Sequence, residues 1–219
     1  MNRKTLCSLI VLTLTCGMAF AQQGKIASGP YKGPLGPMMM APDAPAAVLY
    51  SNLTTDPCTG FKYSIDNGFL LIGPSNCGIP GSTQWLAAPF ISKATQAVTK
   101  VSLAVTNWGI CTPTSNKFTV QIYDDNCSGV PNLPLGTPVT ATSPAAPPAL
   151  ANANFGATGP LLAAGNKYWV VVTTSAASSQ TGTTSVWWQA TTSLEPYNLN
   201  DGFGWNAGPL GGPGGFQVQ

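Results

Sequence analysis

Carboxylates are scarce in this sequence, which has 219 residues and only 7 Asp and Glu. A glycosidase needs two carboxyl groups on either side of the scissile bond. Asp124 paired with Asp201, or with the sole glutamate Glu195, would supply them. Nothing in the spacing places these residues together, and each lies in or beside a predicted turn, where a solvated role is the simpler interpretation. A glycoside hydrolase therefore ranks third among the functions that we consider.

Three adjacent oxygen-bearing side chains, Asp124, Asp125 and Asn126, close a predicted strand just before a Cys-Ser-Gly sequence. Clustered carboxylate and carbonyl oxygens bind calcium, but the D-x-D-x-D-G spacing of a calcium loop is absent here. Asx residues followed by Ser-Gly are the ordinary chemistry of a turn. The pattern favours a turn over a calcium site, and we predict no cofactor.

Aromatic side chains are the other candidates for a binding site. Trp187 and Trp188 are neighbours on a predicted strand, so their rings point to opposite faces. Tyr197 and Trp205 lie near strand ends or in loops. Exposed rings beside amides and hydroxyls suit sugar binding, because a ring stacks on a pyranose face. The simpler interpretation is that the rings fill the ends of a core. A carbohydrate-binding module using these four residues is the alternative function.

Charge is nearly absent, because charged residues make up 7% of the chain against about 25% in an ordinary soluble domain. Arg3 and Lys4 account for the formal net charge of +2, and there is no histidine. A nucleic-acid binder needs a basic face, a Ser-His or Cys-His hydrolase needs an imidazole, and a zinc enzyme normally needs His ligands. These three classes are disfavoured, and we expect no nucleic-acid partner.

Residues 1–21 have the pattern of a secretory signal peptide. A basic start precedes an apolar run, and Ala19-Phe20-Ala21 matches the small-x-small cleavage pattern. Acylation at Cys16 is the alternative, but Thr15 before it departs from the lipoprotein pattern. Residues 22–45 are rich in Gly and Pro without hydrophobic periodicity, which predicts a disordered leader. No later stretch approaches the roughly 18 apolar residues of a membrane span. We therefore expect a secreted or cell-surface protein.

From residue 46 to residue 219, short β-branched or aromatic runs alternate with Gly, Pro, Asn and Asp. This pattern predicts an all-β fold, a single β-sandwich or jelly-roll-like domain of about ten short strands. The expected strands are Ala47–Ser51, Phe61–Ile65, Phe69–Ile72, Gln84–Phe90, Val98–Asn107, Lys117–Tyr123, Pro138–Thr142, Lys167–Thr174, Thr184–Ala190 and Phe216–Gln219.

Alternation along two of these strands predicts which residues face the core. Residues 168–172 are apolar at every position, which predicts a central strand covered on both faces. The residues expected on the inner face are Val101, Leu103, Val105, Phe118, Val120 and Ile122.

Four cysteines, Cys58, Cys77, Cys111 and Cys127, remain after the signal peptide, in a compartment where thiols pair. They allow three connectivities. A turn at Asp66-Asn67-Gly68 would bring Cys58 and Cys77 to one end of a hairpin. A second hairpin, of residues 98–108 with 117–123, would separate Cys111 from Cys127 by about 23 Å, beyond the roughly 7 Å limit for bridged Cα atoms. The connectivity stays open. Four thiolates around zinc would lack any C-x-x-C spacing.

The order of motifs over residues 47–219 resembles the bacterial extracellular β-sandwich repeats called choice-of-anchor domains. The motifs are LYSN, QWLAAPF, VTKVSLAV, IYDDNCSGVPN, AGNKYWVVV, DGFGW and the terminal FQVQ. The resemblance implies a secreted or surface-attached sandwich with no catalytic residues to carry over. The sequence ends after the last expected strand without a sorting helix or basic tail, which favours simple release.

The first hypothesis is therefore a secreted, non-enzymatic domain with a binding or structural role outside the cell. Its expected partners are extracellular polysaccharides or components of the cell envelope. The physiological ligand and the oligomeric state are beyond what the residues indicate.

Overall fold

The computed structural model describes residues 26–28, 47–55, 59–65, 67–71, 84–107, 116–125, 127, 129–174, 185–188, 190, 198–200, 204–207 and 214–219. Within these residues the chain is all-β, with antiparallel strands, one 3₁₀ turn at Gly156–Thr158 and no α-helix. None of them forms a helix that could cross a membrane. The predicted signal peptide and most of the predicted leader lie outside this part of the chain.

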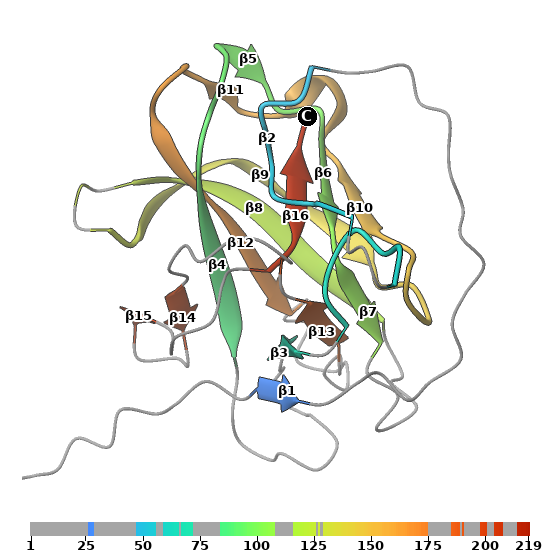
Figure 1. Cartoon of the computed structure of the whole chain (residues 1–219). Coiled ribbons are helices and arrows are strands. Elements are labelled where there is room, and N and C mark those ends of the chain that lie inside the picture. Colours follow the sequence, from blue (N-terminus) through green and yellow to red (C-terminus); the bar gives the residue numbers. More distant parts are fainter. Residues whose placement is uncertain are drawn as a thin grey trace, which may run out of the picture.

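The largest element is a 6-stranded antiparallel sheet, seen from left to lower right in Figure 1. Its strands β12 (Lys167–Thr174) and β8 (Lys117–Asp125) are rich in β-branched and aromatic residues, which fit a pleated, half-buried surface. In spatial order the strands are β15 (Trp205–Ala207), β14 (Asn198–Asn200), β4 (Trp85–Ile91), β12 (Lys167–Thr174), β8 (Lys117–Asp125) and β9 (Pro131–Thr142).

Three smaller sheets complete the fold. The first contains β10 (Ala151–Asn154), β6 (Lys100–Leu103), β16 (Phe216–Val218) and β2 (Tyr50–Ser51). The second contains β1 (Ile26–Ser28), β3 (Asn67–Leu71), β13 (Ser185–Trp188) and β7 (Val105–Asn107). The third pairs β11 (Leu161–Leu162) with β5 (Gln96–Ala97).

One hydrophobic core lies between the large sheet and the smaller ones. Phe90 of β4 packs against Tyr50 of β2 and Phe216 of β16, with ring centroids 5.7 and 6.1 Å apart. Trp187 of β13 meets Phe216 edge-on at 6.0 Å. Aromatic pairs at these distances stabilise a core beyond their buried area. The predicted sandwich is thus confirmed, and Figure 1 shows β2, β6 and β16 crossing one side of the large sheet.

The prediction of inner-face residues is confirmed, since all six are completely buried: Val101, Leu103, Val105, Phe118, Val120 and Ile122. The second hairpin, of residues 98–108 with 117–123, is wrong. Its first strand breaks at Ala104, whose N–H donates to the Gly215 carbonyl, and continues in a different sheet. Strand β6 pairs with β10 and β16, β7 pairs with β13, and β8 pairs with β9 and β12.

The turn predicted at Asp66-Asn67-Gly68 is also wrong. Asn67 and Gly68 lie inside β3, opposite Ser28 and Ala27 of β1, and Phe61–Ile65 forms no strand. The pairing of β1 means that residues 26–28 of the predicted disordered leader are structured. The pairing of β3 with β1 on one edge and with β13 on the other outweighs the turn propensity of Asn67 and Gly68.

Strand β9 begins at Pro131, seven residues before the predicted start at Pro138. Pro131, Pro134 and Pro138 all lie within this strand, at one edge of the large sheet. Proline lacks the N–H that a central strand needs, but an edge strand tolerates it. The prolines also keep this edge from pairing with another chain.

Strand β16 is held between β6 and β2 by one buried side chain. The Asn52 Nδ2 donates to the Gly214 carbonyl at 3.2 Å, and its Oδ1 accepts from the Phe216 N–H at 2.7 Å. A Cβ on Gly214 would lie 2.2 Å from the Trp187 ring, so only glycine lets that ring pack on the backbone. Trp187 Nε1 donates to the Gly215 carbonyl at 3.0 Å.

Asn52→Ala is expected to lower the free energy of unfolding by about 2–3 kcal/mol, because two buried backbone groups lose their partner. Urea denaturation measures the change. Asn132→Ala, at an exposed position of β9, is the matched control and is expected to stay within about 0.5 kcal/mol of wild type. Equal stability of the two variants would contradict this role for Asn52.

Candidate functional site

The Asp124-Asp125 pair lies where β8 turns into β9, and both carboxylates bind backbone or side-chain donors of the fold. Asp124 Oδ1 accepts from the Leu133 N–H at 2.6 Å, across the hairpin. Asp125 Oδ2 accepts from the Cys127 N–H at 3.1 Å, an Asx-type turn. Cys127 itself has a φ of 62°, the left-handed conformation that a tight turn requires. These contacts support a structural role for both carboxylates.

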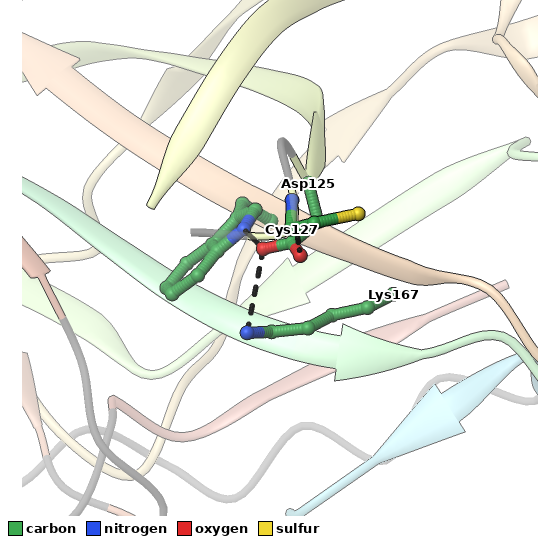
Figure 2. Close-up of polar contacts among 4 residues, drawn as sticks. Asp125, Cys127 and Lys167 are labelled. Carbon is green, nitrogen blue, oxygen red and sulfur yellow. Dashed lines mark hydrogen bonds and ion pairs between the residues drawn. The ribbon is translucent and has the colours of Figure 1, made fainter. Parts of the chain in front are cut away.

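Asp125 also connects the hairpin to the central strand β12. Its Oδ1 accepts from the buried Trp169 Nε1 at 2.8 Å and lies 3.3 Å from the Lys167 Nζ. The Lys167 ammonium is 4.6 Å from the centroid of the Trp169 ring, a cation–π distance. In Figure 2 the Asp125 carboxylate faces Lys167, whereas the Cys127 sulfur points away from both.

The described residues contain no group of three or more His, Cys, Asp or Glu side chains that could hold a metal ion. Asn126, the third member of the predicted calcium candidate, lies outside the described residues, so a calcium site there stays a hypothesis. Glu195 and Asp201, the proposed partners of Asp124 in a glycosidase, lie outside them too. The described geometry therefore gives Asp124 no carboxylate partner other than its neighbour Asp125.

Cys127 is exposed and forms no disulfide within the part of the chain that the structure describes. Cys58, Cys77 and Cys111 lie outside the described residues, so the pairing of the cysteines stays open. The distance argument against a Cys111–Cys127 bond no longer applies, because the hairpin on which it depended is not formed.

Asp125→Ala is expected to lower the free energy of unfolding by about 1–3 kcal/mol, because the Trp169 indole N–H loses its acceptor. Asp125→Asn keeps only one of the two oxygen acceptors, so with that oxygen on the Trp169 indole it loses the exposed hydrogen bond from the Cys127 N–H and the ion pair with Lys167. Since the Lys167 side chain is 38% exposed, that loss is expected to stay below about 1 kcal/mol. Urea unfolding followed by tryptophan fluorescence measures both. Equal losses in the two variants would contradict the indole hydrogen bond as the main contribution of Asp125 to stability.

The predicted aromatic platforms have different outcomes. Trp187 is 1% exposed and belongs to the core, so its assignment as an exposed binding platform is wrong. Trp187 packs against Phe216 on the core side of strand β13. Trp188 pairs with Gly68 in β3, but its side chain is not among those described. Tyr197 lies outside the described residues. Trp205 is partly exposed and becomes the remaining predicted candidate.

Trp205 lies on the outer face of the large sheet, where a second, small hydrophobic cluster covers strand β12. Its buried members are Ala87, Trp169 and Val171, and Tyr123 and Trp205 pack against them as partly exposed rings. Residues 168–172 are all buried, which confirms the prediction that β12 is covered on both faces. The outer face is therefore an aromatic surface and not an ordinary solvated one.

Trp85 lies near Trp205 on this face and was not among the predicted site residues. Both are register partners of Asn200, so their positions lie two strands apart, about 10 Å, on one face of the sheet. Trp85 is partly exposed, but its Nε1 is buried without a hydrogen-bond partner. The surface that its ring presents to solvent is consequently carbon, the chemistry that stacks on a sugar face.

Burial raises the pKa of the Tyr123 phenol above its ordinary value of 10.0. Because the pKa of this phenol is higher in the folded state than in the unfolded state, its neutral form contributes to the free energy of unfolding. That contribution is complete below pH 10.0 and is lost as the pH rises through the folded-state pKa. Wild type is therefore expected to lose stability more steeply than Tyr123→Phe in urea titrations above that pH. Parallel stability curves for the two proteins would contradict the assignment.

No protein-family model matches the chain, and no curated protein is significantly similar to it. The resemblance to choice-of-anchor domains consequently stays a prediction.

Proposed function

We propose that the protein is a secreted, non-enzymatic β-sandwich domain that binds material outside the cell. The observation that carries this proposal is the outer face of the large sheet, where Trp85, Tyr123 and Trp205 are partly exposed around a small buried cluster. Partly exposed rings on a rigid sheet are typical of recognition surfaces. Secretion is supported by the signal pattern of residues 1–21.

A non-enzymatic role is supported by the use of the described carboxylates. Asp124 binds the Leu133 N–H, and Asp125 binds Trp169, Lys167 and Cys127. A general acid or nucleophile has to reach substrate, whereas these carboxylates bind groups of the β8–β9 hairpin and of β12. Their removal is expected to affect stability before any chemistry.

A carbohydrate-binding module is the more specific candidate, and Trp205 favours it. This ring is partly exposed beside Ala87, Trp169 and Val171. The cluster beneath it is uncharged, and the Lys167 and Asp125 charges beside Trp169 are paired with each other. This suits a ligand recognised by stacking and hydroxyl contacts, such as an extracellular polysaccharide or a glycan of the cell envelope. The platform differs from the one that the sequence predicted, because Trp187 is buried.

In affinity electrophoresis, wild type is expected to migrate more slowly through a gel that contains an immobile polysaccharide than through a plain gel. Trp205→Ala is expected to lose most of that retardation, because it removes a stacking ring. Leu133→Ala, an exposed apolar residue on the hairpin, is the control and should migrate as wild type does. No retardation by any member of a broad polysaccharide panel would count against carbohydrate binding. Release of new reducing ends, abolished in Asp124→Asn, Glu195→Gln or Asp201→Asn, would instead support the glycosidase hypothesis.

A further inference from the structure

One line of residues crosses the outer face of four neighbouring strands in register. Thr173 of β12 is opposite Thr119 of β8, which is opposite Thr140 of β9. On the other side of β12, Val172 is opposite Leu86, so continuing the antiparallel register by one residue places Thr173 beside Trp85 of β4. We name Trp85, Thr173, Thr119 and Thr140 the cross-strand row. At a strand spacing of about 4.8 Å the row spans about 14 Å.

Alternation and burial show that the row faces outward. Leu86, Phe118, Val120 and Val172, the chain neighbours of these positions, are in the main core. Trp85, Thr119 and Thr173 are partly exposed, and Thr140 is exposed. The four strands lie side by side in Figure 1. Residues of the row are therefore accessible together, in a straight line perpendicular to the strands.

The chemistry of the row changes along its length. One end is the carbon surface of Trp85, because the indole N–H is buried. The rest is three hydroxyls, each a donor and an acceptor. No hydrogen bond links the side chains of Thr119, Thr140 or Thr173 to another described residue, so their capacity is free for a ligand. Gln121 and Val171 form the next register pair on the same face, and Gln121 Nε2 already donates to the Gly136 carbonyl.

We propose that the cross-strand row is a binding site for a neutral polysaccharide chain laid across β4, β12, β8 and β9. One sugar stacks on Trp85, and the hydroxyls of the following units exchange hydrogen bonds with Thr173, Thr119 and Thr140. This proposal rests on the carbohydrate-binding function above and adds its site and the direction of the chain. The row has no charged member, so a neutral glycan fits it without leaving an unpaired charge.

A protein or nucleic-acid partner fits the row less well. A peptide adding to the sheet would pair with an edge strand, and β9 is guarded by its prolines. By alternation, the charged side chains on the outer face of β8 and β12 are Lys117, Asp125 and Lys167, and Lys167 is ion-paired with Asp125. Two lysines, one of them paired with a carboxylate, make no basic stripe for phosphates.

The test is affinity electrophoresis with neutral and uronic-acid polysaccharides, with wild type and three variants. Trp85→Ala is expected to weaken binding about tenfold, equivalent to one stacked ring. The double variant Thr119→Val and Thr140→Val keeps the shape and β-propensity of both side chains, and its lost hydroxyls are expected to weaken binding at least about fivefold. Thr137→Val, in β9 where the register with β8 is shifted, is the matched control and should bind as wild type does.

The outcomes separate the two proposals. If wild type and all three variants bind a neutral polysaccharide equally well, the cross-strand row is overturned as the site, while carbohydrate binding is left intact. Wild type that binds no polysaccharide would overturn both. Retention by uronic-acid polymers alone, abolished by salt, would overturn the neutral ligand, because that behaviour needs Lys side chains. Thermal unfolding of each variant shows that it is folded, and the threonine variant tests the row even where Trp85→Ala does not fold.

Discussion

The structure depends on a strand whose five central residues are buried on both faces of the sheet. Tyr168, Trp169, Val170, Val171 and Val172 of β12 are all buried, with alternate residues in the main core and in the outer cluster. A strand of this composition in a sandwich requires cover on both faces, because its apolar surface would otherwise remain in water. Covering the outer face is what brings Tyr123 and Trp205 over the sheet. The aromatic surface proposed for binding is thus a consequence of how the fold buries β12.

The few charges of the chain are used at one end of this strand. Lys167, at the beginning of β12, and Asp125, at the end of β8, flank the Trp169 indole, which needs an acceptor for its N–H. A buried donor without a partner costs about 1–3 kcal/mol. Placing the acceptor on the β8–β9 hairpin connects a local turn to the centre of the sheet. The cross-strand row has no charged member, which suits ligands recognised by shape, stacking and hydroxyl contacts.

Alternation and apolar runs in the sequence predicted which residues of the strands are buried. Alternation identified all six inner-face residues of two strands, and the apolar run at 168–172 identified the central strand. Strands β14 and β15 were missed because each has only three residues, and half of β9 was missed because prolines conceal an edge strand. The turn at Asp66-Asn67-Gly68 was wrong because pairing with β1 and β13 outweighs turn propensity.

The candidate site was harder to predict because it depends on register between strands that are far apart in sequence. Threonines 119, 140 and 173 are unremarkable singly, and only the pairing of β12, β8 and β9 aligns them. Because neighbours on a strand point to opposite faces, the sequence predicted that Trp187 and Trp188 do not share one core. It could not show which of them is buried, and Phe216 covers Trp187. Of the predicted residues only Trp205 remains a described, partly exposed ring.

Strand β16 has a consequence for the order in which the chain can fold. It lies between β6 and β2, and its bond to Asn52 joins residues 164 positions apart. Contacts of such separation form late, because loop closure has to precede them. Before β16 pairs with them, β6 and β2 each have one unpaired backbone edge. The Trp187 ring also lacks the backbone of Gly214 on which it packs. Open strand edges are templates for aggregation. A partly synthesised chain is therefore less prone to aggregate while it is unfolded than when it is half folded. The unfolded state is also the one in which a chain can be threaded across a membrane.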